Sequence, residues 1–482
     1  MKKIHAKLIL EAYKPLIRAL SSEGKDFNVG AEEETDYDKQ VLVEEILKQA
    51  HTLAGLPINN LLQAYTLKPL PLVFNSLSLS AIELAPKPQS KKITPIQPLN
   101  IYGSIEHYYQ ELESTDITDA IQELKKQFQK EYEYFLENTQ QNQETRLSTL
   151  QHLLRKYAYC IGIEGVTGCS AFEFTKSIAA FAIAIYENQK FLYFSRAPQE
   201  FYQKYPFLFV GADISGIQNF IYDIVTKGAS KNLKGRSFYL QLLTDCTAQL
   251  VLHKVNIRHS CPIVYSSGGK FFMLLPHTPE VVQILEEIQK EIEKELWNLH
   301  KGKLYLSFGY VPFALQVQNG VQKVSIPEDY LENKFVDSSN LEWSTLWQTI
   351  NHITSKRKQK KFLNLIASQE NFTEFFGEEI SSNLRKGIGR GGDLENDPAY
   401  RICSITGEEI DVKEEFYSLI EPEDYEESMA EKKKKALSTI SKKILNLGDD
   451  LQSAYAWVRV PSNKKAGKYF TIFNIEGAPV YQ

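Results

Sequence analysis

The chain has 482 residues, a formal net charge of -5, 43% hydrophobic residues and 24% charged residues. This is the composition of a soluble globular protein with about three domains, at roughly 100–200 residues each. It excludes an overall polycation, so nucleic-acid contacts need local basic patches, and we do not expect strong RNA binding by the chain alone. No apolar run reaches the roughly 18 residues of a membrane span. Glu11 and Lys14 interrupt any signal-peptide core, so we expect a cytoplasmic protein without membrane contact.

The cysteine and histidine patterns predict no metal site. Five scattered cysteines without a Cys-x-x-Cys pair favour buried thiols over disulfides or a thiolate zinc site. They are Cys160, Cys169, Cys246, Cys261 and Cys403. None of the nine histidines is followed by Asp, the pair with which an HD-type phosphohydrolase binds metal.

Residues 1–205 are predicted to be mostly helical. Prolines between positions 69 and 98 break any helix there. Apolar residues at three- and four-residue spacing then predict amphipathic helices at 117–140, 144–161 and 170–190.

The pattern changes at residues 206–312. A continuous apolar run at 205–216 is typical of a buried central strand, and β-rich runs flank Ser267-Gly268-Gly269 as in a hairpin. Between and after them we expect helices at 216–225, 235–255 and 278–300, and a last strand at 303–313. This order, β-α-β-β-α-β, is that of a ferredoxin-like fold.

Residues 313–482 are predicted to form a connector followed by a mixed linker domain. Gly391-Gly392-Asp393 has no apolar strand close to it, so we interpret it as a loop. An acidic and then basic block at 421–435 is typical of a solvated linker before a helix at 436–448. The predicted fold class is therefore α+β: a ferredoxin-like domain flanked by an N-terminal helical domain and a C-terminal mixed domain.

The hairpin carries the candidate chemistry. Palm enzymes of the cyclase and polymerase class place one Asp at the end of the first strand and further carboxylates in the central hairpin turn, where two metal ions are held. Asp213 occupies the first position, but Lys270 stands where a turn carboxylate is expected. A helix N-cap is the alternative for Asp213, and a plain turn is the alternative for Gly268-Gly269.

A basic segment follows the first strand. Lys231, Lys234 and Arg236 lie with glycines at the expected start of the long helix, and helix N-termini bind phosphate. A solvated basic loop is the alternative.

Together these segments resemble a known family. Residues 212–245 and 263–276 closely resemble the first palm of the large subunit of type III-A (Csm) CRISPR complexes. Residues 153–162 and 171–186 resemble the helices before that palm, and residues 389–409 resemble the start of its zinc-bearing linker domain. The resemblance spans roughly residues 150–410 in family order.

The resemblance implies a subunit of an RNA-guided antiviral complex, with other Csm subunits, crRNA and target RNA as partners. In the family, target RNA switches on an N-terminal HD domain that cuts single-stranded DNA. It also switches on two palms that convert ATP into cyclic oligoadenylates, with GGDD in the second palm. The resemblance also implies that ATP lies against the hairpin turn and the start of the long helix. The candidate nucleotide-binding residues are Asp213, Ser215, Lys234, Arg236, Ser266, Ser267, Gly268, Gly269 and Lys270.

The sequence also departs from the family. It has no His-Asp pair and no GGDD, and Thr406 stands where a second zinc cysteine would follow Cys403. We therefore expect no zinc, no catalytic residue, and Mg²⁺ only beside a partner palm. One hypothesis is a scaffold or regulatory subunit with a degenerate palm that binds ATP. The other is the acceptor-ATP half of a split or truncated cyclic oligoadenylate synthetase, since the chain ends near residue 482, where the second palm is expected to begin.

Overall fold

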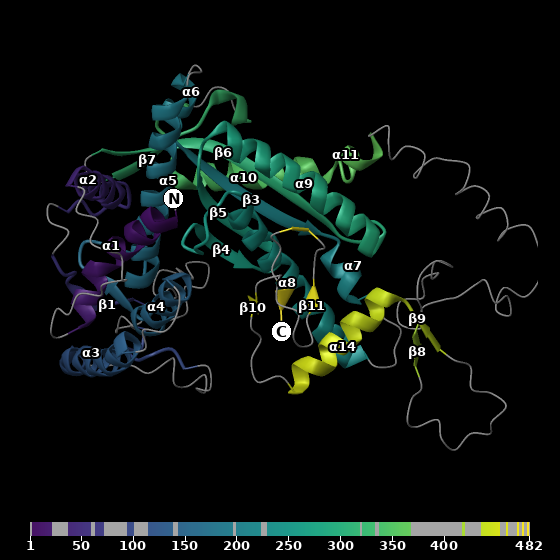
Figure 1. The fold of residues 1–482 in the computed structure, drawn as a ribbon, viewed down its shortest axis with the longest axis horizontal. Helices are drawn as coiled ribbons and strands as arrows, with labels where there is room; N and C mark the ends of the chain where they lie inside the picture. The colour runs from purple at the N-terminus through teal and green to yellow at the C-terminus, as the bar shows by residue number, and fades with distance from the viewer. Residues whose placement is uncertain are drawn as a thin grey trace, which may run out of the picture.

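The computed structural model shows an N-terminal group of helices beside a five-stranded sheet (Figure 1). The residues that it describes are 2–21, 37–58, 63–71, 94–100, 114–137, 143–195, 199–222, 229–318, 321–332, 337–367, 417–419, 435–453, 459–460, 470–471, 475–476 and 480–481. No helix in these ranges is long and apolar enough to cross a membrane.

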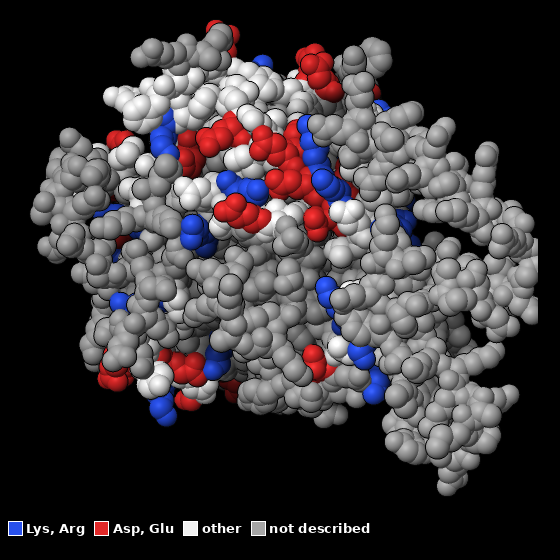
Figure 2. Space-filling model, turned by 45° about the vertical axis from the view of Figure 1, so that its right-hand side comes forward, with Lys and Arg blue, Asp and Glu red and all other residues white. Residues whose placement is uncertain are grey.

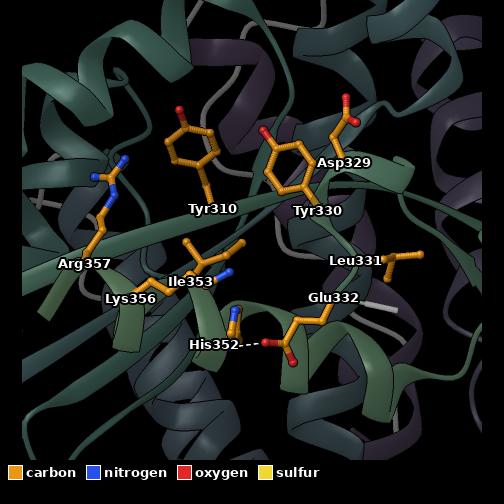
Figure 3. Close-up of a pocket in the computed structure, with 9 residues that line it drawn as sticks. All are labelled: Tyr310, Asp329, Tyr330, Leu331, Glu332, His352, Ile353, Lys356 and Arg357. Carbon is orange, nitrogen blue, oxygen red and sulfur yellow. Dashed lines mark ion pairs between the residues drawn. The ribbon is translucent and has the colours of Figure 1, made fainter. Parts of the chain in front are cut away.

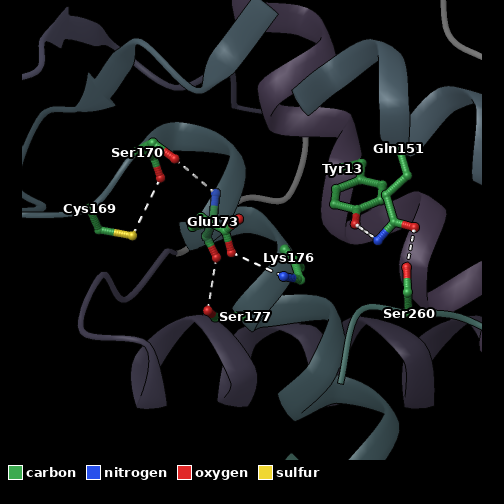
Figure 4. A network of polar contacts seen from close by, with 8 residues as sticks. All are labelled: Tyr13, Gln151, Cys169, Ser170, Glu173, Lys176, Ser177 and Ser260. Carbon is green, nitrogen blue, oxygen red and sulfur yellow. Dashed lines mark hydrogen bonds and ion pairs between the residues drawn. The ribbon is translucent and has the colours of Figure 1, made fainter. Parts of the chain in front are cut away.

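The N-terminal part is mostly helical, and the three helices predicted there are found, although the last of them is largely buried and not amphipathic. Its elements are α1 (Lys2–Leu20), α2 (Tyr37–Leu53), β1 (Leu67–Pro69), α3 (Ser114–Glu137), α4 (Gln143–Ala158), β2 (Ile161–Ile163), α5 (Ala171–Phe194) and α6 (Glu200–Lys204). The largely buried α5 packs against α1 and α2. Its N-cap Ser170 accepts a hydrogen bond from the Glu173 amide at 3.2 Å, which satisfies a helix-end donor (Figure 4).

An antiparallel sheet forms the second part, and the mixed α+β class is confirmed. Its strands are β3 (Phe207–Ser215), β4 (Ile263–Ser267), β5 (Lys270–Pro276), β6 (Tyr305–Gln318) and β7 (Val321–Ser325). They lie in the order β4-β5-β3-β6-β7, so the apolar strand predicted at 205–216 is central. That this sheet is a nucleotide-binding palm stays a prediction.

Helices cover both faces of the sheet. Between the strands the chain forms α7 (Ile217–Tyr222), α8 (Ala229–Lys254) and α9 (Pro279–His300), and α10 (Trp343–Lys358) follows β7 and the short η3 (Glu328–Tyr330). Side chains alternate along β3. Phe209 lies with its ring centroid 4.8 Å from that of Trp347, and a Cβ on Gly211 would come within 2.7 Å of the Ile350 side chain. This face of β3 therefore packs closely on α10.

Residue 312, the expected end of the ferredoxin-like domain, lies within β6. The first part of the expected connector continues this strand, and β7 and α10 then pack on the same sheet. The division at 205 and 312 otherwise stays a prediction.

The C-terminal elements are short apart from α14. They are α11 (Leu363–Ile366), β8 (Tyr417–Leu419), β9 (Lys435–Leu437), α14 (Thr439–Ser453), β10 (Arg459–Val460), β11 (Phe470–Thr471) and β12 (Val480–Tyr481). In Figure 1 α14, in yellow, lies beside α8. Gly391, Gly392, Asp393 and Cys403 lie outside the described residues.

The helical part and the sheet share one continuous apolar core with polar links across it. Gln151 of α4 donates to the Tyr13 hydroxyl of α1 at 2.9 Å and accepts from Ser260 before β4 at 3.1 Å (Figure 4). Asn188 of α5 donates to the His277 carbonyl at 3.0 Å. Buried polar groups that are paired in this way fix how the two parts meet.

Three cysteines lie in this core, as predicted. Cys160, Cys246 and Cys261 are buried, and Cys169 is half-buried. Burial raises the pKa of Cys160 to about 11 and that of Cys261 to about 12, so these thiols stay protonated and unreactive at neutral pH.

Candidate functional site

The hairpin between β4 and β5 has the predicted tight turn. Ser267 pairs with Lys270, and Gly268 and Gly269 between them have φ angles of +62° and +80°, as in a type I′ turn. A Cβ on Gly269 would lie 2.4 Å from the Ile217 side chain, whereas one on Gly268 would meet nothing within 4 Å. Gly269 is therefore needed for packing, and Gly268 is the accessible tip.

Asp213 is neutralised by two lysines. It is 8% exposed, and its Oδ2 lies 3.1 Å from Lys270 Nζ and 2.6 Å from Lys358 Nζ. Lys270 is the residue opposite Asp213 on β5, and Lys358 comes from the last turn of α10. Since Asp213 lies inside β3 and is paired in this way, the alternative reading as a helix N-cap is wrong.

The two divalent ions of a palm do not fit this site. One carboxylate faces two ammonium groups, and both contact the oxygen that would bind a cation. Mg²⁺ needs oxygen ligands and is repelled by adjacent positive charge. Over the described part of the chain no group of three or more His, Cys, Asp or Glu is placed to hold a metal.

A groove of about 800 Å³ lies on the other side of the turn, between α7, α8 and α14. Its lining residues are Ile217, Ile221, Leu233, Lys234, Ser237, Phe238, Leu240, Gln241, Gly268, Gly269 and Leu451. Three of the predicted nucleotide-binding residues, Lys234, Gly268 and Gly269, therefore meet at one groove. Its walls are mostly apolar, with Lys234 as the charged group among them.

The expected helix start is wrong. α8 begins at Ala229, so Lys234 and Gly235 lie in its second turn and offer no free N-terminal amides. Arg236 is 3% exposed, donates to the Phe220 carbonyl, and has its guanidinium 5.1 Å from the Phe220 ring centroid. Arg236 thus anchors α7 and does not line the groove.

The remaining predicted residues lie around the hairpin and the end of β3. Ser215 ends β3 opposite Tyr305, and Ser267 is exposed beside the turn. The Ser266 hydroxyl is buried without a hydrogen-bond partner. The nine candidates are therefore divided between the Asp213 ion pairs, the groove, the surrounding strands and, for Arg236, the contact between α8 and α7.

A second, smaller pocket of about 240 Å³ opens beside α10 (Figure 3). Tyr310 and Tyr330 line it, and His352 Nδ1 lies 2.7 Å from Glu332 Oε1. Acidic and basic side chains balance there, because Asp329 and Glu332 stand with Lys356 and Arg357. The pocket therefore favours neither a cationic nor an anionic ligand.

Sequence reasoning missed Lys358 and its helix. The available signal was the basic run at 356–361, in which five of six residues are Lys or Arg. Nothing in that run indicates which residue reaches Asp213, because α10 must first be placed on the sheet.

Residues 206–378 match the family described as Csm1 subunit domain B. Two relatives are named CRISPR system single-strand-specific deoxyribonuclease Cas10/Csm1 (subtype III-A). The one from Streptococcus thermophilus is 33% identical over 173 residues, which cover 34% of this chain and 22% of the relative. The one from Methanocaldococcus jannaschii is 27% identical over 243 residues, which cover 44% of this chain and 28% of the relative. The chain thus spans less than a third of the length of these curated relatives.

Solved structures are similar to this chain at a lower sequence identity. A Csm1-Csm4 cassette in complex with AMPPNP has a TM-score of 0.47 at 21% identity, covering 76% of this chain and 49% of that one. Csm1 of T. onnurineus has a TM-score of 0.45 at 22% identity, covering 67% and 39%.

Proposed function

We propose that this chain, which contains a Csm1 domain B and resembles the large subunit of type III-A CRISPR complexes, works in such a complex as a scaffold and regulatory subunit. Its partners are the other Csm subunits, with crRNA and target RNA held in the assembly. Its palm binds ATP without turning it over. The curated relatives are named single-strand-specific deoxyribonucleases. The proposal for this chain does not include that activity, because the chain lacks a His-Asp pair.

The ion pairs of Asp213 carry the non-catalytic part of the proposal. Phosphoryl transfer needs metal ions that bridge the phosphates and activate the attacking hydroxyl. Here Lys270 and Lys358 take up the carboxylate at the first palm position, at 3.1 and 2.6 Å. Two fixed ammonium groups supply positive charge but cannot activate a hydroxyl, because a protonated lysine has no free base.

The groove beside the turn supports ATP binding. Its volume of about 800 Å³ lies in the usual range for small-molecule sites, roughly 300–1,000 Å³. Apolar walls suit an adenine ring, and Lys234 provides a point charge for phosphates. Gly268 lets a phosphate approach the backbone closely, because it carries no side chain.

A split or truncated cyclic oligoadenylate synthetase is the second candidate function. The observation that favours it is that Gly268 and Lys234 line an open groove, where ATP could act as acceptor for a GGDD palm on another chain. In that case the groove contributes substrate positioning and the partner contributes the metal ions.

The test uses the full chain with labelled ATP, Mg²⁺ and target RNA, with and without a GGDD-bearing partner. Gly268→Asp is compared with Gly268→Asn, which has the same shape, tolerates a positive φ and lacks the negative charge. We expect ATP binding that is weakened at least about tenfold by Gly268→Asp and by Lys234→Ala, and much less by Gly268→Asn.

Three outcomes separate the possibilities. Binding without product, with or without the partner, supports the regulatory subunit. Product only with the partner, lost in Gly268→Asp, supports the split synthetase. Product from the chain alone, or no ATP binding in any mixture, contradicts the proposed palm.

A further inference from the structure

The pocket beside α10 lies between that helix, β6, and η3 with the residues that follow it. Its volume of about 240 Å³ is below the roughly 300–1,000 Å³ of sites for drug-sized ligands, so it suits a smaller molecule. Figure 3 shows the rings of Tyr310 and Tyr330 on one side of this space. The side chains of His352 and Lys356 lie on the other side. All of its lining residues differ from those of the ATP groove and of the Asp213 ion pairs, so the pocket is a separate feature of the molecule.

Two of the charged side chains that line the pocket are held in fixed contacts. Arg357 pairs with Glu286 Oε1 at 2.5 Å, and its guanidinium lies 5.9 Å from the centroid of the Tyr310 ring. Glu332 Oε1 lies 2.7 Å from His352 Nδ1. One cation and one anion of the lining are thus already partnered within the protein.

Lys356 and Asp329 are the other two charged side chains of the lining. Both are exposed, and within the described part of the chain neither forms an ion pair. Figure 2 shows acidic and basic side chains close together on one face of the molecule, where neighbouring charges can pair. Lys356 and Asp329 instead lie at opposite ends of the pocket in Figure 3 and do not reach each other. A ligand with both a positive and a negative group contacts both of them, whereas a ligand with a single charge contacts only one.

A buried ring nitrogen and an aromatic ring add to this arrangement. His352 Nε2 is buried and has no hydrogen-bond partner among the described residues, while Nδ1 of the same ring faces Glu332. Buried polar atoms are normally hydrogen-bonded, so Nε2 is available to a polar group of a ligand. Tyr330 follows Asp329 directly in η3, and the face of an aromatic ring attracts an ammonium group. The end of the pocket at Asp329 and Tyr330 therefore favours the positive group of a ligand.

We propose that this pocket binds a small zwitterion, namely an α-amino acid with an apolar side chain. The ammonium group lies beside Asp329 and Tyr330, and the carboxylate lies beside Lys356. Leu331 and Ile353 also line the pocket and provide an apolar surface for the side chain. The inference goes beyond the proposed function and does not depend on whether ATP binds in the groove.

The experiment measures binding of L-leucine to the full chain by saturation-transfer NMR. Isocaproate has the side chain and carboxylate of leucine without the ammonium group, and isoamylamine has the side chain and ammonium group without the carboxylate. Wild type is compared with Asp329→Asn and Lys356→Met. The matched controls are Glu328→Gln and Lys360→Met, which change exposed residues outside the pocket lining.

We expect saturable binding of leucine by wild type and by both controls. Removing one charge from either side, in isocaproate or isoamylamine or in a pocket variant, should weaken binding about fivefold, which is the size of one exposed charge contact. Asp329→Asn should bind leucine and isocaproate about equally, and Lys356→Met should bind leucine and isoamylamine about equally. All four substitutions are at exposed positions, and melting temperatures equal to that of wild type verify folding.

Three results would overturn the proposal. If isocaproate or isoamylamine binds wild type as tightly as leucine does, the pocket does not recognise a zwitterion. If the control variants lose as much binding as the pocket variants, leucine binds elsewhere. If wild type shows no saturable binding of leucine, the pocket is not a site for an amino acid of this kind.

Discussion

At the scale of residues, the Asp213 ion pairs decide what the hairpin can do. Asp213 and Lys270 are opposite each other in adjacent strands, so their contact follows from strand register alone. Lys358 adds a second ammonium group from α10 at 2.6 Å. Asp213 stands where the predicted palm would hold its first carboxylate, and the two ammonium groups give this position a positive charge.

Restoring a negative charge beside Asp213 is expected to create a metal site. Lys270→Asp/Lys358→Ala leaves two carboxylates side by side with no fixed cation between them. We expect this variant to bind Mn²⁺ with a Kd on the order of 10⁻³ M, and wild type to show no binding at the same concentrations. Isothermal titration calorimetry measures both. Lys358→Ala alone is the control and should bind no Mn²⁺, because Lys270 still pairs with Asp213. Wild-type binding equal to that of the double variant contradicts this account.

At the scale of elements, the crossing of α8 and α14 depends on two glycines. A Cβ on Gly235 would lie 2.4 Å from the Ile444 carbonyl oxygen, and one on Gly448 would lie 2.3 Å from that of Lys231. Gly235 was expected to open a phosphate-binding helix start. It instead allows α14 to approach α8 closely, which closes one side of the groove through Leu451.

Gly235→Ala is therefore expected to loosen α14. Alanine favours a helix by roughly 1 kcal/mol over glycine, but forcing a methyl group against backbone costs more, up to about 3 kcal/mol. We expect faster hydrogen exchange in residues 439–453 and a lower melting temperature. The neighbouring variant Lys234→Ala, at an exposed position, should change neither. Unchanged exchange in Gly235→Ala would mean that the two helices do not pack as described.

At the scale of the whole molecule, buried histidines link stability to pH. His51 in the helical part donates from Nδ1 to the Leu47 carbonyl and accepts from the Tyr65 hydroxyl, both at 2.8 Å. Burial lowers the pKa values of His51, His259 and His277 to about 4 each. These histidines lie in both parts of the molecule, so their protonation weakens the shared core.

The direction in which stability changes with pH follows from proton binding. Between pH 6.5, the ordinary pKa, and about 4, the unfolded chain binds more protons, so stability is complete above 6.5 and falls as pH decreases. We expect the free energy of unfolding to decrease over this window. In His51→Gln the slope of the unfolding free energy against pH should be shallower by up to about 1.4 kcal/mol per pH unit, which is the contribution of one bound proton. Chemical denaturation at several pH values measures it. A flat wild-type profile contradicts the prediction.

Local patterns in the sequence determined the α+β class, the amphipathic helices, the central apolar strand and the Gly268-Gly269 turn. These features depend on periodicity and turn chemistry over a few residues, so they can be recognised without neighbours in space. The resemblance to the large subunit of type III-A complexes was recognisable for the same reason, since the motifs that carry it are contiguous segments. The lysine in place of a turn carboxylate was also visible directly.

Only the tertiary structure decided what surrounds these motifs. It placed Lys358 on Asp213, Arg236 under α7, Gly235 against α14 and Phe362 against Trp297. Each of these contacts joins segments whose relative position depends on how helices pack on the sheet, and no local pattern encodes that packing. The sequence by itself thus determined the elements and the missing carboxylate. The packing of α10 and α14 decided that lysines neutralise Asp213 and that Lys234 and the turn share a groove.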